Sequence, residues 1–175
     1  MPELIRSRIR DVPDYPQPGI VFKDITPLLA DGAAFTAVVG ALAAGYTADG
    51  AARVDKVLGI EARGFILAAP VACCLGAGFI PVRKEGKLPA DRYGESYQLE
   101  YGTATVEVLT DAFEPSDRVL VIDDVLATGG TARAAADLVR QAGAEVAGLA
   151  VLLELAFLNG RAKLPGLPVS ALLTV

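Results

Sequence analysis

Histidine is absent from all 175 residues, and this absence removes several kinds of chemistry. Without an imidazole the chain cannot form a Ser–His or Cys–His nucleophilic pair. A zinc site would also have too few of its usual ligands, because the only cysteines are Cys73 and Cys74. These neighbours fall inside a predicted helix, where adjacent side chains point to different faces. We therefore expect small packing residues rather than a disulfide.

Tryptophan is also absent, and aromatic residues make up only 6% of a chain that is 53% hydrophobic. The apolar content comes from Ala, Val and Leu, which suits an α/β protein with buried strands. No uninterrupted apolar run reaches the roughly 20 residues of a membrane-spanning helix, since the most apolar window, residues 65–75, contains Pro70. The charged N-terminus lacks the apolar region of a signal peptide. We expect a cytoplasmic protein with no membrane partner.

Positive charge is scarce overall, because the formal net charge is −5. A basic face is what nucleic-acid binding requires, so we expect no nucleic-acid partner. The basic residues are nevertheless concentrated, since four of them fall within ten positions: Arg83, Lys84, Lys87 and Arg92. A local basic cluster on an acidic protein suits a small polyanionic ligand.

The strongest pattern in the chain lies between residues 119 and 143. The apolar run Val119–Ile122 predicts a strand buried on both faces. Two carboxylates follow, Asp123 and Asp124, and then a loop rich in Gly and Thr and a helix predicted over 132–143. The loop residues are Ala127, Thr128, Gly129, Gly130 and Thr131. Glycines allow close backbone approach, and amides at a helix N-terminus bind anions, so the loop is a candidate phosphate site.

The acidic pair distinguishes this loop from other phosphate-binding loops. A Walker loop needs a Lys directly after its glycines, and none follows here. The glycine spacing of a dinucleotide-binding turn is also absent. Two carboxylates beside a phosphate cradle suit a sugar phosphate, because they can accept hydrogen bonds from ribose hydroxyls. The alternative is an acidic turn followed by an ordinary Thr helix cap.

The rest of the chain alternates between predicted helices and strands. We expect helices over 1–10, 33–46 and 65–75, and strands over 54–60, 78–83, 146–155 and 169–175. Alternation of this kind predicts a parallel sheet with right-handed crossovers. The predicted fold is a doubly wound, mostly parallel α/β sheet in a single domain, 1–175. Its ligand should bind at the carboxyl ends of the strands.

The segment from Lys84 to Ser96 shows no apolar period and is dominated by Gly, Pro and charge. Its length is typical of an active-site lid, and the alternative is a disordered surface loop. The alternation from Tyr97 to Leu109 predicts a β-ribbon after it. Glu100, on that ribbon, is either a solvated strand residue or a carboxylate aimed into the site.

Two further segments are open to two interpretations. Residues 20–27 mix bulky apolar side chains with Lys23 and Asp24, which suits either a lid over a flat apolar ligand or a packed arm with a surface ion pair. The turn 61–64 carries Arg63 between a predicted strand and a predicted helix. Arg63 is either a surface residue or part of the site.

Five segments together resemble type I phosphoribosyltransferases, and the match covers almost the whole chain. They are Val21–Leu29, Glu61–Phe65, Arg83–Pro89, Ser96–Gly102 and Val119–Ala135. The first and fourth segments are similar to the adenine-specific members of the family. The resemblance implies a small hood from residues of about 1–30 and C-terminal segments, together with a flexible β-ribbon loop. It also implies transfer of phosphoribose from phosphoribosyl pyrophosphate to adenine, giving AMP and pyrophosphate.

The resemblance also implies roles for individual residues. Asp123 and Asp124 would hold the ribose, and residues 127–131 the 5′-phosphate. Arg63, Lys84 and Lys87 would face pyrophosphate, and Arg83 would reach across the interface of a homodimer. The base would be held by Val21, Phe22, Lys23, Glu100, Tyr101 and Leu155. Glu100 and Arg63 would be catalytic, and Mg²⁺ would be bound mainly through the substrate.

Two alternatives to this function remain. The first is a phosphoribosyltransferase for another base, which residues 22–27 and Glu100 disfavour. The second is a non-enzymatic sensor of phosphoribosyl ligands. Only about twenty residues precede the base-binding arm, too few for a helix-turn-helix module.

Overall fold

The computed structural model describes residues 1–46, 53–98 and 102–175, and its centre is a seven-stranded sheet in the order β5-β6-β4-β3-β7-β8-β9. The strands are β3 (Lys56–Ile60), β4 (Gly78–Lys84), β5 (Arg92–Gln98), β6 (Thr103–Leu109), β7 (Arg118–Leu126), β8 (Glu145–Glu154) and β9 (Val169–Thr174). Neighbours from β4 to β9 pair in parallel, whereas β6 is antiparallel to both β4 and β5. The predicted mostly parallel sheet is confirmed.

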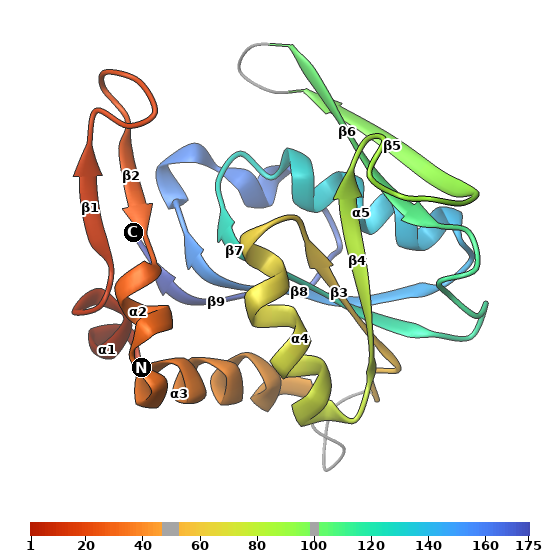
Figure 1. The fold of residues 1–175 in the computed structure, drawn as a ribbon, viewed down its shortest axis with the longest axis horizontal. Coiled ribbons are helices and arrows are strands. Elements are labelled where there is room, and N and C mark those ends of the chain that lie inside the picture. The colour runs from red at the N-terminus through yellow and green to blue at the C-terminus, as the bar shows by residue number, and fades with distance from the viewer. Residues whose placement is uncertain (47–52, 99–101) are drawn as a thin grey trace.

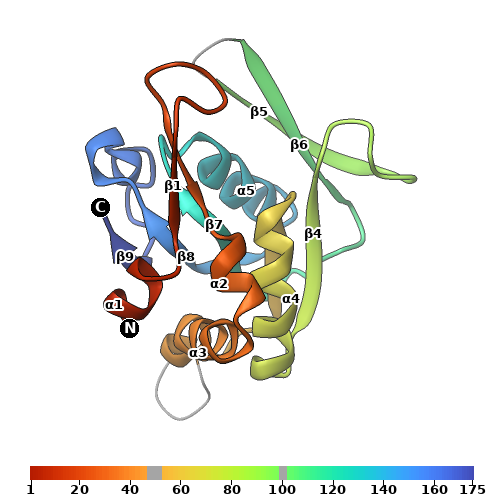
Figure 2. The ribbon, with the colours of Figure 1, turned by 60° about the vertical axis from the view of Figure 1, so that its left-hand side comes forward.

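Helices cover both faces of this sheet (Figures 1 and 2). Helices α3 (Gly32–Ala43) and α4 (Arg63–Leu75) pack on one face, and α5 (Gly130–Gln141) packs on the other. Strand β7 shows why both faces are apolar. Its Leu120 and Ile122 belong to the core under α3 and α4, whereas Val119 and Val121 belong to the core under α5. Alternate side chains of one strand therefore fill two cores.

The hood lies beside the sheet, to its left in Figure 1. It consists of α1 (Pro2–Arg6), β1 (Arg10–Pro13), β2 (Val21–Asp24) and α2 (Thr26–Ala30), and β1 pairs antiparallel with β2. Helix α1 is shorter than the predicted helix 1–10, because the chain enters β1 at Arg10. Short 3₁₀ turns complete the structure: η1 (Ala44–Tyr46), η2 (Ala156–Leu158) and η3 (Gly160–Lys163).

The strand order fixes where a ligand can bind. After β3 the chain passes through α4 to β4 on one side, and after β7 it passes through α5 to β8 on the other side. Strands β3 and β7 are neighbours, so their two following loops diverge and leave a crevice between them. The turn 61–63 and the loop 127–131 both open at this crevice, where the sequence predicted the site.

The prediction of one long irregular loop from Lys84 to Ser96 is wrong. Residues 92–98 form β5, and only residues 85–91 form the connection from β4. The missed signal is an alternation of period two. Tyr93 and Tyr97 pack against the core under α5, whereas the intervening Gly94 and Ser96 are exposed. Gly94 and the polar residues between the tyrosines concealed this alternation.

Two other expectations need correction. Strand β7 continues to Leu126, so the acidic pair lies within the strand rather than after it. Cys73 and Cys74 are exposed and are not packing residues. Helix α4 buries Leu67, Ala68, Val71 and Ala72, and the two residues after this stripe turn away from the sheet.

Candidate active site

The loop between β7 and α5 forms a small polar hollow. A cavity of about 70 Å³ is lined by Asp123, Val151 and residues 125–132. Gly129 has a left-handed backbone (φ +79°), and α5 begins at the next residue. The first amides of a helix have no partner within it, and the helix dipole favours an anion there. The predicted phosphate loop therefore has the backbone arrangement that anion binding needs.

Gly160, which the sequence analysis did not identify, packs directly against the backbone of this loop. A Cβ at Gly160 would overlap the carbonyl oxygen of Ala127, and a Cβ at Gly129 would overlap the carbonyl oxygen of Gly160. Two backbone segments therefore touch without side chains between them. The sequence signal for this contact is the pair Asn159-Gly160, a combination that is typical of turns.

The segment that carries Gly160 is anchored to the sheet by a buried carboxylate. Arg161 donates to both oxygens of Glu154, at 2.6 and 2.7 Å, and to the carbonyl of Val169 at 2.8 Å. The Arg161 guanidinium lowers the pKa of Glu154. Two parallel charge-assisted bonds fix orientation as well as distance. The fork thus holds residues 155–163 against the phosphate loop.

The acidic pair sits between β7 and the start of α4. Asp123 Oδ1 accepts a hydrogen bond from the amide of Asp124 at 2.9 Å. An added Cβ at Gly64 would lie 2.9 Å from the same Asp123 oxygen and 3.0 Å from the carbonyl oxygen of Ile122. Glycine at position 64 therefore lets α4 approach the two carboxylates closely.

Burial makes both carboxylates difficult to ionise. Desolvation, and then the negative charge of Asp124, raise the pKa of Asp123 well above its ordinary value. Desolvation also raises the pKa of Asp124, although Arg63 opposes the shift. The Asp124 side chain is only 6% exposed, and Asp123 beside it is half-buried. Two adjacent buried acids with raised pKa values are a frequent mark of a functional site.

Arg63 joins the acidic pair to the hood. Its Nε lies 2.9 Å from Asp124 Oδ2, and its guanidinium carbon lies 4.9 Å from the centre of the Phe22 ring. The geometry at Asp124 Oδ2 is that of an ion pair and not of a hydrogen bond, since this buried oxygen has no hydrogen-bond partner. The peptide bond between Glu61 and Ala62, just before Arg63, is cis. Arg63 therefore lies between the acidic pair and Phe22, with its side chain 38% exposed.

A larger cavity, of about 820 Å³, opens between the hood and the C-terminal segment. Its apolar part is formed by Ile20, Val21, Leu155, Phe157 and Leu158, and Ala127 and Thr128 of the phosphate loop form another part. Val21 and Phe157 are exposed, at 49% and 74%. The sequence analysis identified Val21 and Leu155 but missed Phe157 and Leu158, which no periodic pattern marks.

Lys23 lies in the wall of the same cavity, but its charge is already paired. Its Nζ donates to both oxygens of Asp11 at 2.8 Å, directly across the pairing of β1 and β2. Arg10 and Asp24 form a second cross-strand pair at 2.7 Å. Hydrogen bonds from Thr26, with help from Arg10, lower the pKa of Asp24 to about 2. The arm thus carries the surface ion pairs of one interpretation, and it also lines the cavity.

Arg83 and Lys84 of the basic cluster are hydrogen-bonded to the turn that carries Arg63. Glu61 Oε2 accepts hydrogen bonds from the amide of Lys84 at 2.8 Å and from Arg83 Nε at 3.0 Å. The Lys84 amide and the Arg83 guanidinium lower the pKa of Glu61, so it remains ionised. Lys87 lies in the connection after β4, with its amide bonded to the carbonyl of Lys84. Glu100 and Tyr101 lie outside the described residues.

The residues present could supply only a few of the ligands of a magnesium ion. In the described parts of the chain, no three carboxylate or thiol groups come together as a metal site. The acidic pair offers carboxylate oxygens near the phosphate loop. Mg²⁺ commonly takes one or two carboxylates and completes its shell with substrate phosphates and water.

None of the helices in the described residues has the length and apolar character that crossing a bilayer requires.

The chain is similar to known proteins over most of its length. Residues 28–164 match the family described as phosphoribosyl transferase domain. A protein of Acidothermus cellulolyticus named adenine phosphoribosyltransferase is 63% identical over 173 residues, which are 99% of this chain and 96% of that protein.

Solved structures extend the likeness to the whole fold. The adenine phosphoribosyltransferase of Thermoanaerobacter pseudethanolicus superposes with a TM-score of 0.95 at 46% identity, covering 100% of both chains. The enzyme of Saccharomyces cerevisiae, complexed with adenine and an imino-altritol bisphosphate, gives a TM-score of 0.89 at 34% identity over 95% of each chain.

Proposed function

The chain belongs to the adenine phosphoribosyltransferase family, and we propose that it transfers phosphoribose from phosphoribosyl pyrophosphate to adenine, giving AMP and pyrophosphate. Such a reaction salvages free adenine as a nucleotide. The support comes from high identity over nearly the full length of the relatives and from a site whose parts suit each part of the substrates.

One observation carries the proposal. The 820 Å³ cavity has an apolar region at the hood and reaches the phosphate loop at Ala127 and Thr128. A nucleotide has the same polarity, with a flat base at one end and a phosphate at the other. Val21 and Leu155 line the apolar region and suit the two faces of a purine. The yeast relative was crystallised with adenine, which agrees with a base in such a cavity.

The acidic pair and the phosphate loop would hold the phosphoribosyl group. The amides of residues 129–131, at the start of α5, suit the 5′-phosphate. Asp123 and Asp124 suit the ribose hydroxyls, which would donate to them. A fixed ribose keeps its anomeric carbon in line between the base and the departing pyrophosphate, which is the positioning part of catalysis. As the bond to pyrophosphate lengthens, positive charge develops on the sugar, and the nearby carboxylates stabilise it.

The cationic residues would serve the leaving group. Arg63, Lys84 and Lys87 are the candidates, because negative charge accumulates on pyrophosphate as it departs. Arg63 is paired with Asp124 in this structure, so binding of pyrophosphate would exchange one anionic partner for another. The acidic pair would supply the few protein ligands of a Mg²⁺ ion, which would add positive charge near the leaving group.

The proton on the base needs an acceptor, and Glu100 is our proposal for it. The chain has no histidine, so a carboxylate is the natural group to share a proton with a purine ring nitrogen.

We also propose a homodimer, with α4 and β4 on the shared face. Ile66 and Phe79, on these two elements, are exposed apolar residues at 43% and 38%. Sedimentation equilibrium tests this assembly.

A chromatographic assay tests the base and the chemistry together. The protein is incubated with phosphoribosyl pyrophosphate, Mg²⁺ and one of adenine, hypoxanthine, guanine, xanthine or orotate, and the nucleotide product is separated. The proposal requires AMP from adenine and little product from the other bases. Faster turnover of another base would establish a different phosphoribosyltransferase, and binding of phosphoribosyl pyrophosphate without any product would support a sensor.

A further inference from the structure

Glu107, a buried carboxylate outside the site, fixes the backbone that carries the basic cluster of residues 83–92. Glu107 lies in the middle of β6, opposite Arg83 of β4 on one side and Gly94 of β5 on the other. Its side chain is only 8% exposed. A buried charge without partners is strongly destabilising, so its contacts identify what it stabilises.

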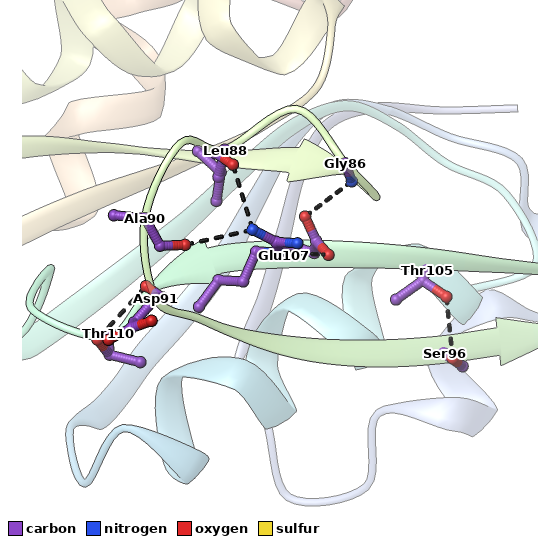
Figure 3. Close-up of polar contacts among 9 residues, drawn as sticks. Gly86, Leu88, Ala90, Asp91, Ser96, Thr105, Glu107 and Thr110 are labelled. Carbon is purple, nitrogen blue, oxygen red and sulfur yellow. Dashed lines mark hydrogen bonds and ion pairs between the residues drawn. The ribbon is translucent and has the colours of Figure 1, made fainter.

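Both oxygens of Glu107 bind the connection between β4 and β5. Oε2 accepts the amide of Gly86 at 3.0 Å, and Oε1 accepts Arg92 Nε at 3.0 Å (Figure 3). Gly86 has a left-handed backbone (φ +76°), where the chain turns back after β4. One carboxylate therefore joins the start of the turn to the first residue of β5.

Arg92 extends this contact to the rest of the turn. Its second nitrogen, Nη1, donates to the carbonyl oxygens of Leu88 and Ala90, both at 3.3 Å. The carbonyl of Asp91 accepts the amide of Thr110 at 3.1 Å. Residues 85–91 thus form a closed turn around the Glu107–Arg92 pair. Two members of the basic cluster, Arg83 and Arg92, are thus paired with carboxylates within the chain.

We propose that Glu107 is a positioning residue for the pyrophosphate site, acting through the turn that carries Lys84 and Lys87. The inference rests on the proposed function, which places these two lysines on pyrophosphate. They flank Gly86 in the sequence, and the amide of Lys84 is also fixed by Glu61 at 2.8 Å. Two carboxylates thus set the path of the backbone between the lysines before any substrate arrives. Prior ordering of this kind lowers the entropy lost on binding.

The test separates binding of phosphoribosyl pyrophosphate from the other steps. Glu107→Gln keeps the shape of the side chain but removes its charge and one acceptor, and Arg92→Lys keeps the charge but removes the fork to Leu88 and Ala90. We expect Glu107→Gln to raise the KM for phosphoribosyl pyrophosphate about tenfold or more, which is the effect of losing one charge-assisted hydrogen bond. The KM for adenine should change less than about threefold. Arg92→Lys should show the same selective effect to a smaller degree.

Thr105→Val is the matched control. Ser96 and Thr105 share a hydroxyl hydrogen bond of 3.0 Å on the same ribbon, away from the turn (Figure 3). Loss of this hydrogen bond should leave the KM for phosphoribosyl pyrophosphate and the KM for adenine unchanged. Circular dichroism and melting temperature are recorded for every variant.

The outcomes distinguish the possibilities. A lower melting temperature with unchanged KM for phosphoribosyl pyrophosphate in Glu107→Gln would show that Glu107 only stabilises the ribbon and would overturn the inference. If Glu107→Gln does not fold, the KM pattern of Arg92→Lys decides in the same way. Wild-type protein that neither binds phosphoribosyl pyrophosphate nor forms AMP would instead refute the proposed function.

Discussion

Gly64→Ala tests whether the close approach of α4 to the acidic pair matters for both folding and binding. The change adds one methyl group at the second residue of α4. That methyl carbon would lie 2.9 Å from Asp123 Oδ1 and 3.0 Å from the carbonyl oxygen of Ile122. The Ile122 oxygen belongs to the β7 backbone and cannot rotate away. Either α4 or the carboxylate of Asp123 must therefore move by a few tenths of an ångström.

The expected magnitude follows from two opposing effects. Ala is ordinarily better than Gly in a helix by about 0.5–1 kcal/mol. Overpacking a close contact ordinarily destabilises by about 1–3 kcal/mol. We expect the overpacking to dominate, giving a net loss of about 1–2 kcal/mol and a fall in melting temperature of about 2–4 °C for each kcal/mol. A displaced Asp123 should also raise the KM for phosphoribosyl pyrophosphate about tenfold, below the roughly 10²-fold loss that a full 1 Å misplacement can produce.

Gly40→Ala provides the control for this change. Gly40 is in the interior of α3, and an added Cβ there would meet nothing within 4 Å. The same substitution should therefore raise the melting temperature and leave the kinetics unchanged. The measurements are thermal unfolding by circular dichroism and initial rates at varied phosphoribosyl pyrophosphate. If Gly64→Ala behaves like Gly40→Ala in both assays, the close packing of α4 against Asp123 has no consequence and the reasoning fails.

Two further changes test the carboxylates. Desolvation and the charge of Asp124 raise the pKa of Asp123 above its ordinary 3.8, so the native protein holds this proton more tightly than the unfolded chain and loses stability as the pH rises above about 4. Asp123→Asn should therefore melt higher than wild type at neutral pH, and the difference should shrink towards pH 4; a constant difference across that range would contradict the raised pKa. Glu100→Leu should lower kcat about 10²–10⁴-fold while phosphoribosyl pyrophosphate binds nearly normally. A kcat within about threefold of wild type, far below that range, would return Glu100 to the role of a solvated strand residue.

The central strand and its loop could be predicted because their pattern is local. Val119–Ile122 is apolar on both faces, and the acidic pair and the glycines follow it directly in the sequence. The site location also followed from alternation of helices and strands, since a parallel sheet places its loops at one edge. The predicted strand was shorter than β7. The carboxylates at 123 and 124 end the apolar run, although the strand continues to Leu126.

Contacts between distant segments could not be predicted in the same way. Gly160 meets Ala127 across 33 positions, and Glu107 meets Gly86 across 21 positions. Neither pair leaves a period in the sequence, since one is a backbone contact and the other joins a strand to a turn. The exposure of Cys73 and Cys74 was likewise set by which stripe of α4 meets the sheet.

The most direct test of the account is the double variant Asp123→Asn with Asp124→Asn. Both side chains keep their shape, but the ribose loses two charge-assisted acceptors, each contributing about 1.5–3 kcal/mol. The measurement is AMP formation from adenine at varied phosphoribosyl pyrophosphate, together with calorimetric binding of phosphoribosyl pyrophosphate and Mg²⁺. The account predicts that kcat/KM falls about 10²–10⁴-fold and that binding weakens, as the summed loss implies. Wild-type binding and turnover in the double variant would contradict the assignment of the acidic pair to the ribose.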